Sequence, residues 1–226
     1  MKALILAVAA LFTAPTTANA GPPLICIDPG HDATGQSGYE RIGPGSDVYK
    51  IKDPGGTAGE AGVVLKIGFK LRRLLLADGY RVAMTRTTDE FTYGNRGNIA
   101  RAKFCNRHAA ALMIRIHADG STDSSHHGVS TLYPAWHKGW TDDILPESKE
   151  AAAIVQRKVV RATGAANLGL VRRADLTGFN WANVPAILIE TGFMTNPREG
   201  RRLRHAWYQQ KVALGLMRAS RAFAPL

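Results

Sequence analysis

Cysteine is scarce in this chain of 226 residues, which contains only Cys26 and Cys105. Neither has a second cysteine nearby at the spacing of zinc ligands, which argues against a cysteine-based metal site. An even number of cysteines in an exported chain permits a disulfide bond. The alternative is that Cys26 is a small buried side chain within a strand. The sequence leaves these two interpretations open.

Long hydrophobic runs are also missing. The apolar run at residues 3–12 is too short to span a bilayer. It follows Lys2 and precedes the sequence TANA at residues 17–20, which ends in an Ala-x-Ala cleavage site. This order predicts a secretory signal peptide at residues 1–20, with a buried N-terminal helix as the alternative. We therefore expect a mature chain, residues 21–226, that is exported to the periplasm or the extracellular cell wall and has no integral membrane segment.

Acidic residues are outnumbered, with 18 Asp and Glu against 29 Lys and Arg, which gives a formal charge of +11. This excess favours polyanionic partners. Basic and aromatic residues do not interleave as base stacking requires, so we expect no nucleic-acid partner. For an exported chain, the cell wall or an anionic membrane surface fits the charge better. Arginines at residues 198–204 fit a solvated helix face that also favours an anionic wall. Internal repeats and low-complexity tracts are absent, and we expect a monomer.

Hydrophobic spacing predicts alternating strands and helices. The clearest helix covers residues 60–78, with apolar side chains on one face and Gly79 placed to end it. Further strands are expected at residues 80–85, 128–133 and 168–171, and further helices at residues 96–106, 147–163 and 197–223, the last broken near His205. The pattern predicts α/β architecture, as a single domain with a mainly parallel twisted sheet flanked by helices. The Gly-rich stretch at residues 32–59 is expected to be a long loop.

Polar side chains follow the apolar runs that predict buried strands. Three such runs cover residues 24–27, 111–116 and 186–189. They lead to His31, His117 and Glu190, at the strand ends where open α/β sheets place their chemistry. Glu60 opens the first helix and is expected to point towards the core. Two imidazoles and one carboxylate leave a fourth position on zinc for water, and a second carboxylate is then available as general base.

Four motifs occur in order, namely IDPGH at residues 27–31, GE at 59–60, IHAD at 116–119 and IETGFMTN at 189–196. Together they resemble zinc-dependent N-acetylmuramoyl-L-alanine amidases, in the class that includes the cell-division amidases, over residues 24–223. The resemblance implies a zinc ion held by His31, Glu60 and His117, with Glu190 as catalytic acid and base. It implies that metal-activated water hydrolyses the amide between N-acetylmuramic acid and L-alanine in peptidoglycan, with muropeptides as substrates.

Two positions depart from the pattern of these amidases. A second glycine often follows the first histidine, where this chain has Asp32. Arg115 replaces a small polar residue and is expected on the same strand face as His117. Arg115 either neutralises Glu190, or contacts substrate carboxylates, or pairs with an acid away from the metal, which we favour. These amidases often carry an inhibitory helix between the second histidine and the catalytic glutamate. Residues 120–147 are too few for a long one, which predicts an accessible groove.

Other polar and aromatic side chains have two interpretations each. Asp28 either orients a metal ligand or caps the Pro-Gly turn, and we favour the turn. Asp119 either lines the site or lies away from it, and we favour neither interpretation. Trp181 is the best placed tryptophan to form a wall for sugar or peptide, ahead of Trp136 and Trp140. Three histidines lie in a polar loop and are expected to be solvated: His126, His127 and His137.

Three functions are compatible with these patterns. The first is a secreted peptidoglycan amidase. The second is a catalytically silent protein that binds or regulates the cell wall, and the presence of all four expected site residues counts against it. The third is a zinc peptidase or deacetylase that acts on another amide.

Overall fold

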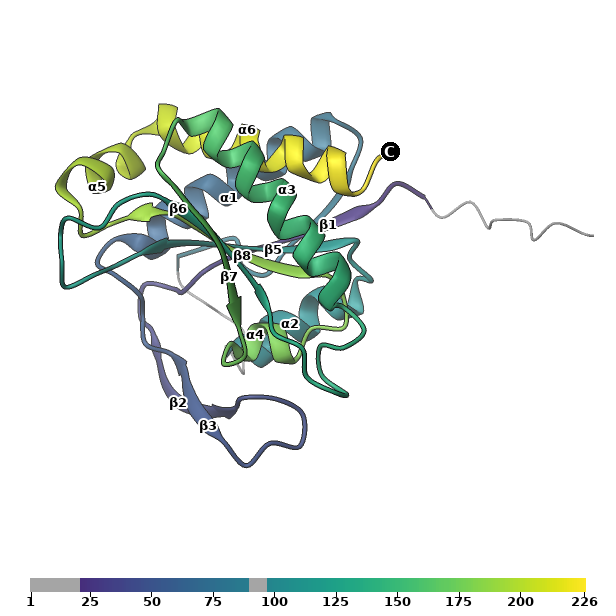
Figure 1. Cartoon of the computed structure of the whole chain (residues 1–226). Coiled ribbons are helices and arrows are strands. Elements are labelled where there is room, and N and C mark those ends of the chain that lie inside the picture. The colour runs from purple at the N-terminus through teal and green to yellow at the C-terminus, as the bar shows by residue number, and fades with distance from the viewer. Residues whose placement is uncertain (1–20, 90–96) are drawn as a thin grey trace, which may run out of the picture.

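The computed structural model describes residues 21–89 and 97–226. Its centre is a six-stranded sheet with the strand order β4-β1-β5-β8-β6-β7 (Figure 1). The strands are β1 (Leu24–Pro29), β4 (Arg81–Met84), β5 (Leu112–Asp119), β6 (Val129–Pro134), β7 (Asn167–Arg173) and β8 (Ala186–Phe193). Neighbouring strands are parallel except β6 and β8, which are antiparallel. The predicted α/β domain with a mainly parallel sheet is confirmed.

Helices cover both faces of this sheet. They are α1 (Glu60–Ala77), α2 (Asn98–Arg107), α3 (Leu145–Thr163), α4 (Thr177–Asn180), α5 (Pro197–Arg204) and α6 (Ala206–Phe223). Helices α1, α3 and α6 pack on one face, with α6 in contact with both α1 and α3, while α2 and α4 lie on the other (Figure 1). The break at His205 between α5 and α6 is where the sequence predicted it. Gly79 follows α1 with a φ of 97°, which fits its predicted role in ending the helix.

The central strands are apolar throughout because both faces of the sheet are buried. Ile25 and Ile27 of β1 belong to the core under α1, α3 and α6. Cys26 lies between them and points to the opposite face. It belongs to the second core, where it packs with residues of α2 and α4. Near the carboxyl ends of β1, β5 and β8, the positions of this second face are occupied by polar side chains instead. Because side chains alternate between the two faces of the sheet along each strand, these polar groups share one face and one edge of the sheet.

Two features differ from the sequence prediction. Strand β5 continues to Asp119 and β8 to Phe193, so His117 and Glu190 lie within their strands rather than at the ends. The Gly-rich stretch contains an antiparallel hairpin of β2 (Gln36–Arg41) and β3 (Tyr49–Asp53). Apolar residues alternate with lysines along β3, which is the pattern of a strand. The surrounding glycines and prolines obscured that pattern, so the prediction of one long loop was wrong.

A disulfide bond joins Cys26 of β1 to Cys105 of α2, across 79 residues of sequence. Both side chains are fully buried, so both interpretations of Cys26 hold at once: it is a small core residue and it is paired. The bond fastens α2 to the sheet, and α2 carries side chains that support the site.

Reduction of this disulfide is expected to lower the free energy of unfolding by about 4 kcal/mol, because the bond closes a long loop in the unfolded chain. Urea unfolding of the oxidised and the reduced protein measures the difference. The double variant Cys26→Ala/Cys105→Ala is the control, because its unfolding midpoint should not respond to reductant. Equal midpoints for the oxidised and reduced wild-type protein would contradict the prediction.

The predicted signal peptide, residues 1–20, lies outside the described residues. Among the helices that the structure describes, none combines the length and the apolar character needed to cross a bilayer.

Candidate active site

His31 lies in the turn that follows β1, in a left-handed backbone conformation with a φ of 53°. Two buried arginines hold this turn, since Arg101 donates a hydrogen bond to the His31 carbonyl and Arg86 donates one to the Gly30 carbonyl. The Nδ1 atom of His31 lies 2.5 Å from the Asp53 Oδ1 atom. A carboxylate on Nδ1 fixes the orientation of the ring and leaves Nε2 available as a ligand atom.

Asp53 was missed by the sequence analysis because it ends the hairpin strand β3, which had been predicted as loop. It is buried, and burial alone would raise its pKa, but the hydrogen bond and charge of His31 lower that pKa below its usual value. The ionised carboxylate is the form that orients an imidazole ring. The lysine–apolar alternation before Asp53 was the pattern that could have identified it.

Glu60 is the first residue of α1 and is buried, as predicted. Its Oε1 atom lies 3.4 Å from the Nε2 atom of His31 and 3.1 Å from the Nδ1 atom of His117. The backbone N–H of Ala118 donates to the same oxygen, and the N–H of Thr57 donates to Oε2. These contacts, together with the position at the start of a helix, hold the carboxylate ionised between the two rings.

His117 brings the second imidazole from β5. Its ring centroid lies 4.8 Å from that of His31. The ring occupies the space above Gly30, where any Cβ atom would lie 2.3 Å from His117 Cε1. Burial lowers the pKa of His117, which keeps the ring neutral and therefore able to bind a cation. Its Nε2 atom is buried and has no hydrogen-bond partner among the described residues.

The predicted ligand atoms converge. One potential ligand atom from each of His31, Glu60 and His117 lies within 4.8 Å of the other two. Two imidazoles and a carboxylate suit zinc among the common divalent ions. The incomplete hydrogen bonding of His117 and the orientation of His31 by Asp53 both fit such an ion.

Glu190 lies beside this cluster. It is the register partner of His117 in the parallel pair β5 and β8, so the two side chains project from the same face of the sheet. Burial raises the pKa of Glu190 well above its usual value, and the negative charges of Asp119 and Glu60 raise it further. The Glu190 Oε2 atom is buried without a hydrogen-bond partner among the described residues. Such an unsatisfied carboxyl group is costly unless it has a role in the site.

Asp28 does not cap the Pro-Gly turn, so that interpretation was wrong. Its carboxylate accepts hydrogen bonds from Arg101 and Arg115, both at 2.8 Å, and from the Thr85 hydroxyl. Burial alone would raise the pKa of Asp28, but the two guanidinium groups hold it well below its usual range. The preferred interpretation of Arg115, a salt bridge to an acid away from the metal, is confirmed. The same ion cluster supports the site, because Arg101 also holds the His31 carbonyl.

A cavity of about 380 Å³ lies beside the two histidines. Its lining includes His31, His117, Arg115, Leu188 and the hairpin lysines Lys50 and Lys52. Residues 120–144 are all described and contain no helix, so no inserted helix covers the groove, as the sequence predicted. The cationic wall formed by β3 was not predicted.

Trp140 and Trp181 contact the hairpin, and neither lines this cavity. The indole N–H of Trp181 donates to the carbonyl of Arg41, and Trp140 packs so closely on Gly43 that a Cβ atom there would lie 2.5 Å from its ring. Trp181 does not line the cavity beside the two histidines, so its role as a substrate wall stays a prediction. The loop histidines are exposed, as predicted: His126, His127 and His137.

A His–Glu–His cluster with an adjacent carboxylate, at the carboxyl edge of an α/β sheet, is the arrangement of a metal-dependent hydrolase. Residues 25–220 match the family model described as N-acetylmuramoyl-L-alanine amidase (Amidase_3). The chain belongs to this family of metal-dependent amidases and is a peptidoglycan amidase. The resemblance found in the four sequence motifs is thereby confirmed.

Individual relatives agree with this assignment. The chain is 29% identical over 227 residues to the N-acetylmuramoyl-L-alanine amidase Rv3717 of Mycobacterium tuberculosis, covering 92% of this chain and 89% of the relative. It is 28% identical over 189 residues to the amidase LytC of Bacillus subtilis, covering 84% of this chain but 33% of LytC. The crystal structure of the amidase Ami1 from Mycobacterium smegmatis superposes with a TM-score of 0.80 at 25% identity, covering 92% of this chain and 99% of Ami1. The fold of the described residues is therefore that of amidases of this family.

Proposed function

We propose that the chain uses a zinc ion to hydrolyse the amide bond between N-acetylmuramic acid and L-alanine in peptidoglycan. His31, Glu60 and His117 hold the ion, and Glu190 is the general base. The observation that supports this most directly is the convergence of the three ligand atoms within 4.8 Å, next to a carboxylate in register with His117.

The ion supplies positive charge that polarises the scissile carbonyl and makes water more acidic. Neighbouring groups hold the ligand side chains in position for the ion. Asp53 orients the His31 ring through Nδ1, and the backbone N–H groups of Thr57 and Ala118 fix the Glu60 carboxylate. This preorganisation lowers the cost of arranging the ligands when the ion binds.

Glu190 moves the proton. In its ionised form it accepts a proton from the attacking water, and it then donates that proton to the departing amine of L-alanine. Burial and the neighbouring carboxylates raise the pKa of Glu190, which strengthens it as a base, and the charge of a bound ion would favour its ionised form. One carboxyl group therefore serves both steps.

The substrate reaches the site through the cavity beside His31 and His117. Lys50 and Lys52 make one side of this cavity cationic, which suits the carboxylates of a stem peptide. Leu188 provides an apolar contact on the sheet.

Chelation is expected to abolish turnover, because removing the ion removes the positive charge that would activate the water and the scissile carbonyl. Glu190 alone cannot replace that charge. Purified muropeptides are digested with and without chelator, and mass spectrometry identifies the bond that is cut. Activity should return on addition of stoichiometric Zn²⁺. Activity that persists without metal contradicts the proposal, retention on the wall without product supports a silent wall-binding protein, and a cut elsewhere supports a peptidase or deacetylase.

We infer that the chain acts outside the cytoplasm as a monomer. Cleavage of the leader at residues 1–20 leaves the catalytic domain as residues 21–226. Family membership supports this location, because peptidoglycan lies outside the cytoplasmic membrane.

A further inference from the structure

Helix α1 carries a stripe of unbalanced positive charge. After Glu60 it contains no Asp or Glu, while Lys66, Lys70 and Arg73 recur at the three- and four-residue spacing of one helix face. None of these three cations forms an ion pair with a described residue. Like charges at this spacing destabilise an isolated helix by a few tenths of a kcal/mol per pair. The arrangement therefore works against local stability, and an anion bound at this face would reduce the repulsion.

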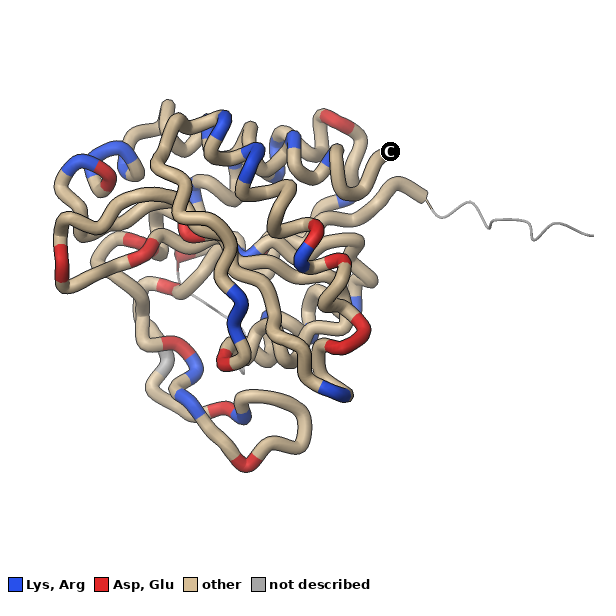
Figure 2. The backbone as a smooth tube through the Cα atoms, in the orientation of Figure 1, with Lys and Arg blue, Asp and Glu red and all other residues tan. Residues whose placement is uncertain are grey.

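The neighbouring helices extend this charge. The acid-free helix α6 packs along α1, and α5 contributes Arg204 beside it. Figure 2 shows Lys and Arg recurring along these upper helices, with few acidic residues among them. Glu199 of α5 cannot neutralise the patch, because it is buried and accepts hydrogen bonds from the backbone N–H groups of Gly128 and Phe193. Asp78, at the end of α1, is bound to Arg221.

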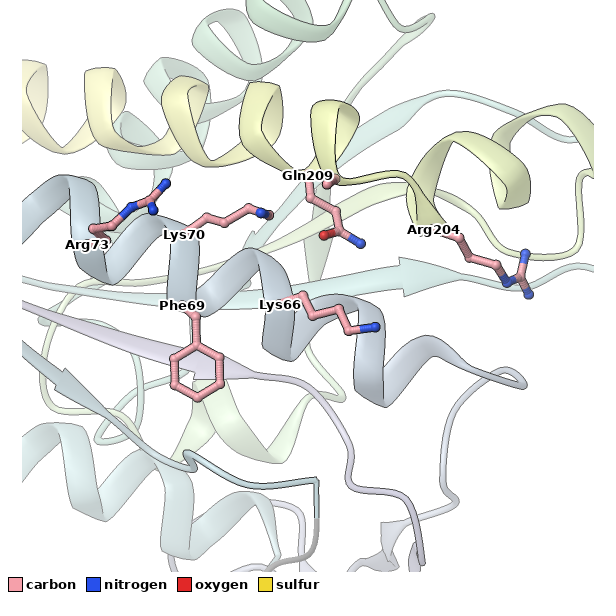
Figure 3. Close-up of a pocket in the computed structure, with 7 residues that line it drawn as sticks. Lys66, Phe69, Lys70, Arg73, Arg204 and Gln209 are labelled. Atoms are coloured by element: carbon pink, nitrogen blue, oxygen red, sulfur yellow. The ribbon is translucent and has the colours of Figure 1, made fainter.

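A hollow of about 510 Å³ lies between α1 and the start of α6. Figure 3 shows three basic side chains that project from α1, namely Lys66, Lys70 and Arg73. Arg204 projects from the end of α5, and Gln209 of α6 lies between Lys70 and Arg204. We call this group of four cations the basic hollow. No acidic side chain lines it, and it shares no lining residue with the cavity beside the two histidines. The hollow is therefore separate from that cavity.

The basic hollow begins close to the candidate metal ligands. A Cβ atom on Gly59, the residue before Glu60, would lie 3.8 Å from the Nη2 atom of Arg204. From there the stripe follows α1 away from the sheet edge, and Arg73 is 13 residues, about 20 Å, beyond Glu60 along the helix axis. A polymer network held at this stripe would remain next to the reacting bond.

We propose that the basic hollow binds the peptide carboxylates of a peptidoglycan strand next to the one being cut. Lysine and arginine are the side chains that pair with carboxylates, and N-acetylated sugars carry no charge, so the peptides are the anionic part of this substrate. A concave site between two helices admits a chain more readily than a flat bilayer surface. The inference rests on the activity of the family on peptidoglycan and is independent of the metal and of Glu190.

Binding to insoluble cell wall tests the proposal. Sedimentation with purified sacculi is measured at low ionic strength in the Glu190→Gln background, so that the wall is not consumed. The triple variant Lys66→Gln/Lys70→Gln/Arg73→Gln is expected to bind about tenfold more weakly, as the loss of a few exposed charge pairs implies. Its dependence on salt concentration should also be shallower than that of the parent.

Two matched variants isolate the site. Lys149→Gln/Arg157→Gln/Arg161→Gln removes the same charge from exposed positions of α3 and should bind like the parent. Lys66→Arg/Lys70→Arg/Arg73→Lys keeps the charge of the hollow and should also bind like the parent. Thermal unfolding of each variant confirms that it is folded. Parent-like binding by the glutamine triple variant, or an equal loss in the α3 variant, would overturn the proposal.

Chemically treated walls identify the anion. Binding should fall when the carboxylates of the sacculi are converted to amides, and it should survive hydrolysis of any attached phosphodiester polymers. The reverse result would show a phosphate-bearing partner and would overturn the assignment to peptide carboxylates. Turnover of soluble muropeptides by the protein with Glu190 intact is followed separately, so a failed catalytic mechanism and a failed binding site give different results.

Discussion

Glu190→Gln should lower kcat on muropeptides by about 10²- to 10⁴-fold, the range that a general base contributes. The amide side chain fills the same volume but cannot accept a proton, so water loses its base and the departing amine loses its acid. Metal content should stay near that of the wild type, because the proposed ligands are His31, Glu60 and His117. Turnover by chromatography of released peptides and metal content by elemental analysis are measured on the same preparation.

Glu147→Gln is the matched control, because it makes the same chemical change at an exposed position in the first turn of α3. It should leave kcat unchanged. Glu190→Asp keeps the carboxyl group but shortens its reach, so an activity between those of wild type and Glu190→Gln is expected. Full turnover by Glu190→Gln would remove Glu190 from the mechanism.

His117→Ala should remove both the metal and the activity. The substitution deletes one of the two imidazoles and leaves a carboxylate and one histidine, which is too few ligands for a catalytic zinc site. Metal content measured after dialysis should fall to background, and turnover should fall with it. Excess Zn²⁺ in the assay is expected to restore little, since the ligand itself is missing.

The exposed His127→Ala variant is the control for this prediction, because it removes an imidazole from a solvated loop. It should retain metal and activity. Since the His117 ring also fills space against Gly30, thermal unfolding is measured to separate ligand loss from a packing defect. A folded His117→Ala protein with normal metal content would move the ligand elsewhere.

Much of the site could be predicted from sequence because its residues follow strongly apolar strands. A neutral run such as residues 186–189 is typical of a strand buried on both faces, and a polar residue after it then falls at the carboxyl edge of the sheet. Glu60 followed from helical periodicity in the same way. The error in strand length had little consequence, because the alternation of side chains continues through His117 and Glu190.

The supporting residues could not be predicted with equal success. Asp53 reaches His31 only because the hairpin folds back over the edge of the sheet, and glycines hid that hairpin. Asp28 was expected in a local turn, but its partners Arg101 and Arg115 are 73 and 87 residues away in the sequence. Contacts between residues so distant in sequence leave no local pattern.

The amino-acid sequence by itself determined the sheet, the order of its motifs and the four polar groups that meet at its edge, because buried strands and amphipathic helices are encoded by local periodicity. Only the tertiary structure decided how those groups are held. It brought Asp53 to His31, paired Cys26 with Cys105, joined Asp28 to two arginines, and placed the basic residues of α1 beside α6. These contacts depend on where separate elements pack in space, which the spacing of residues along the chain does not specify.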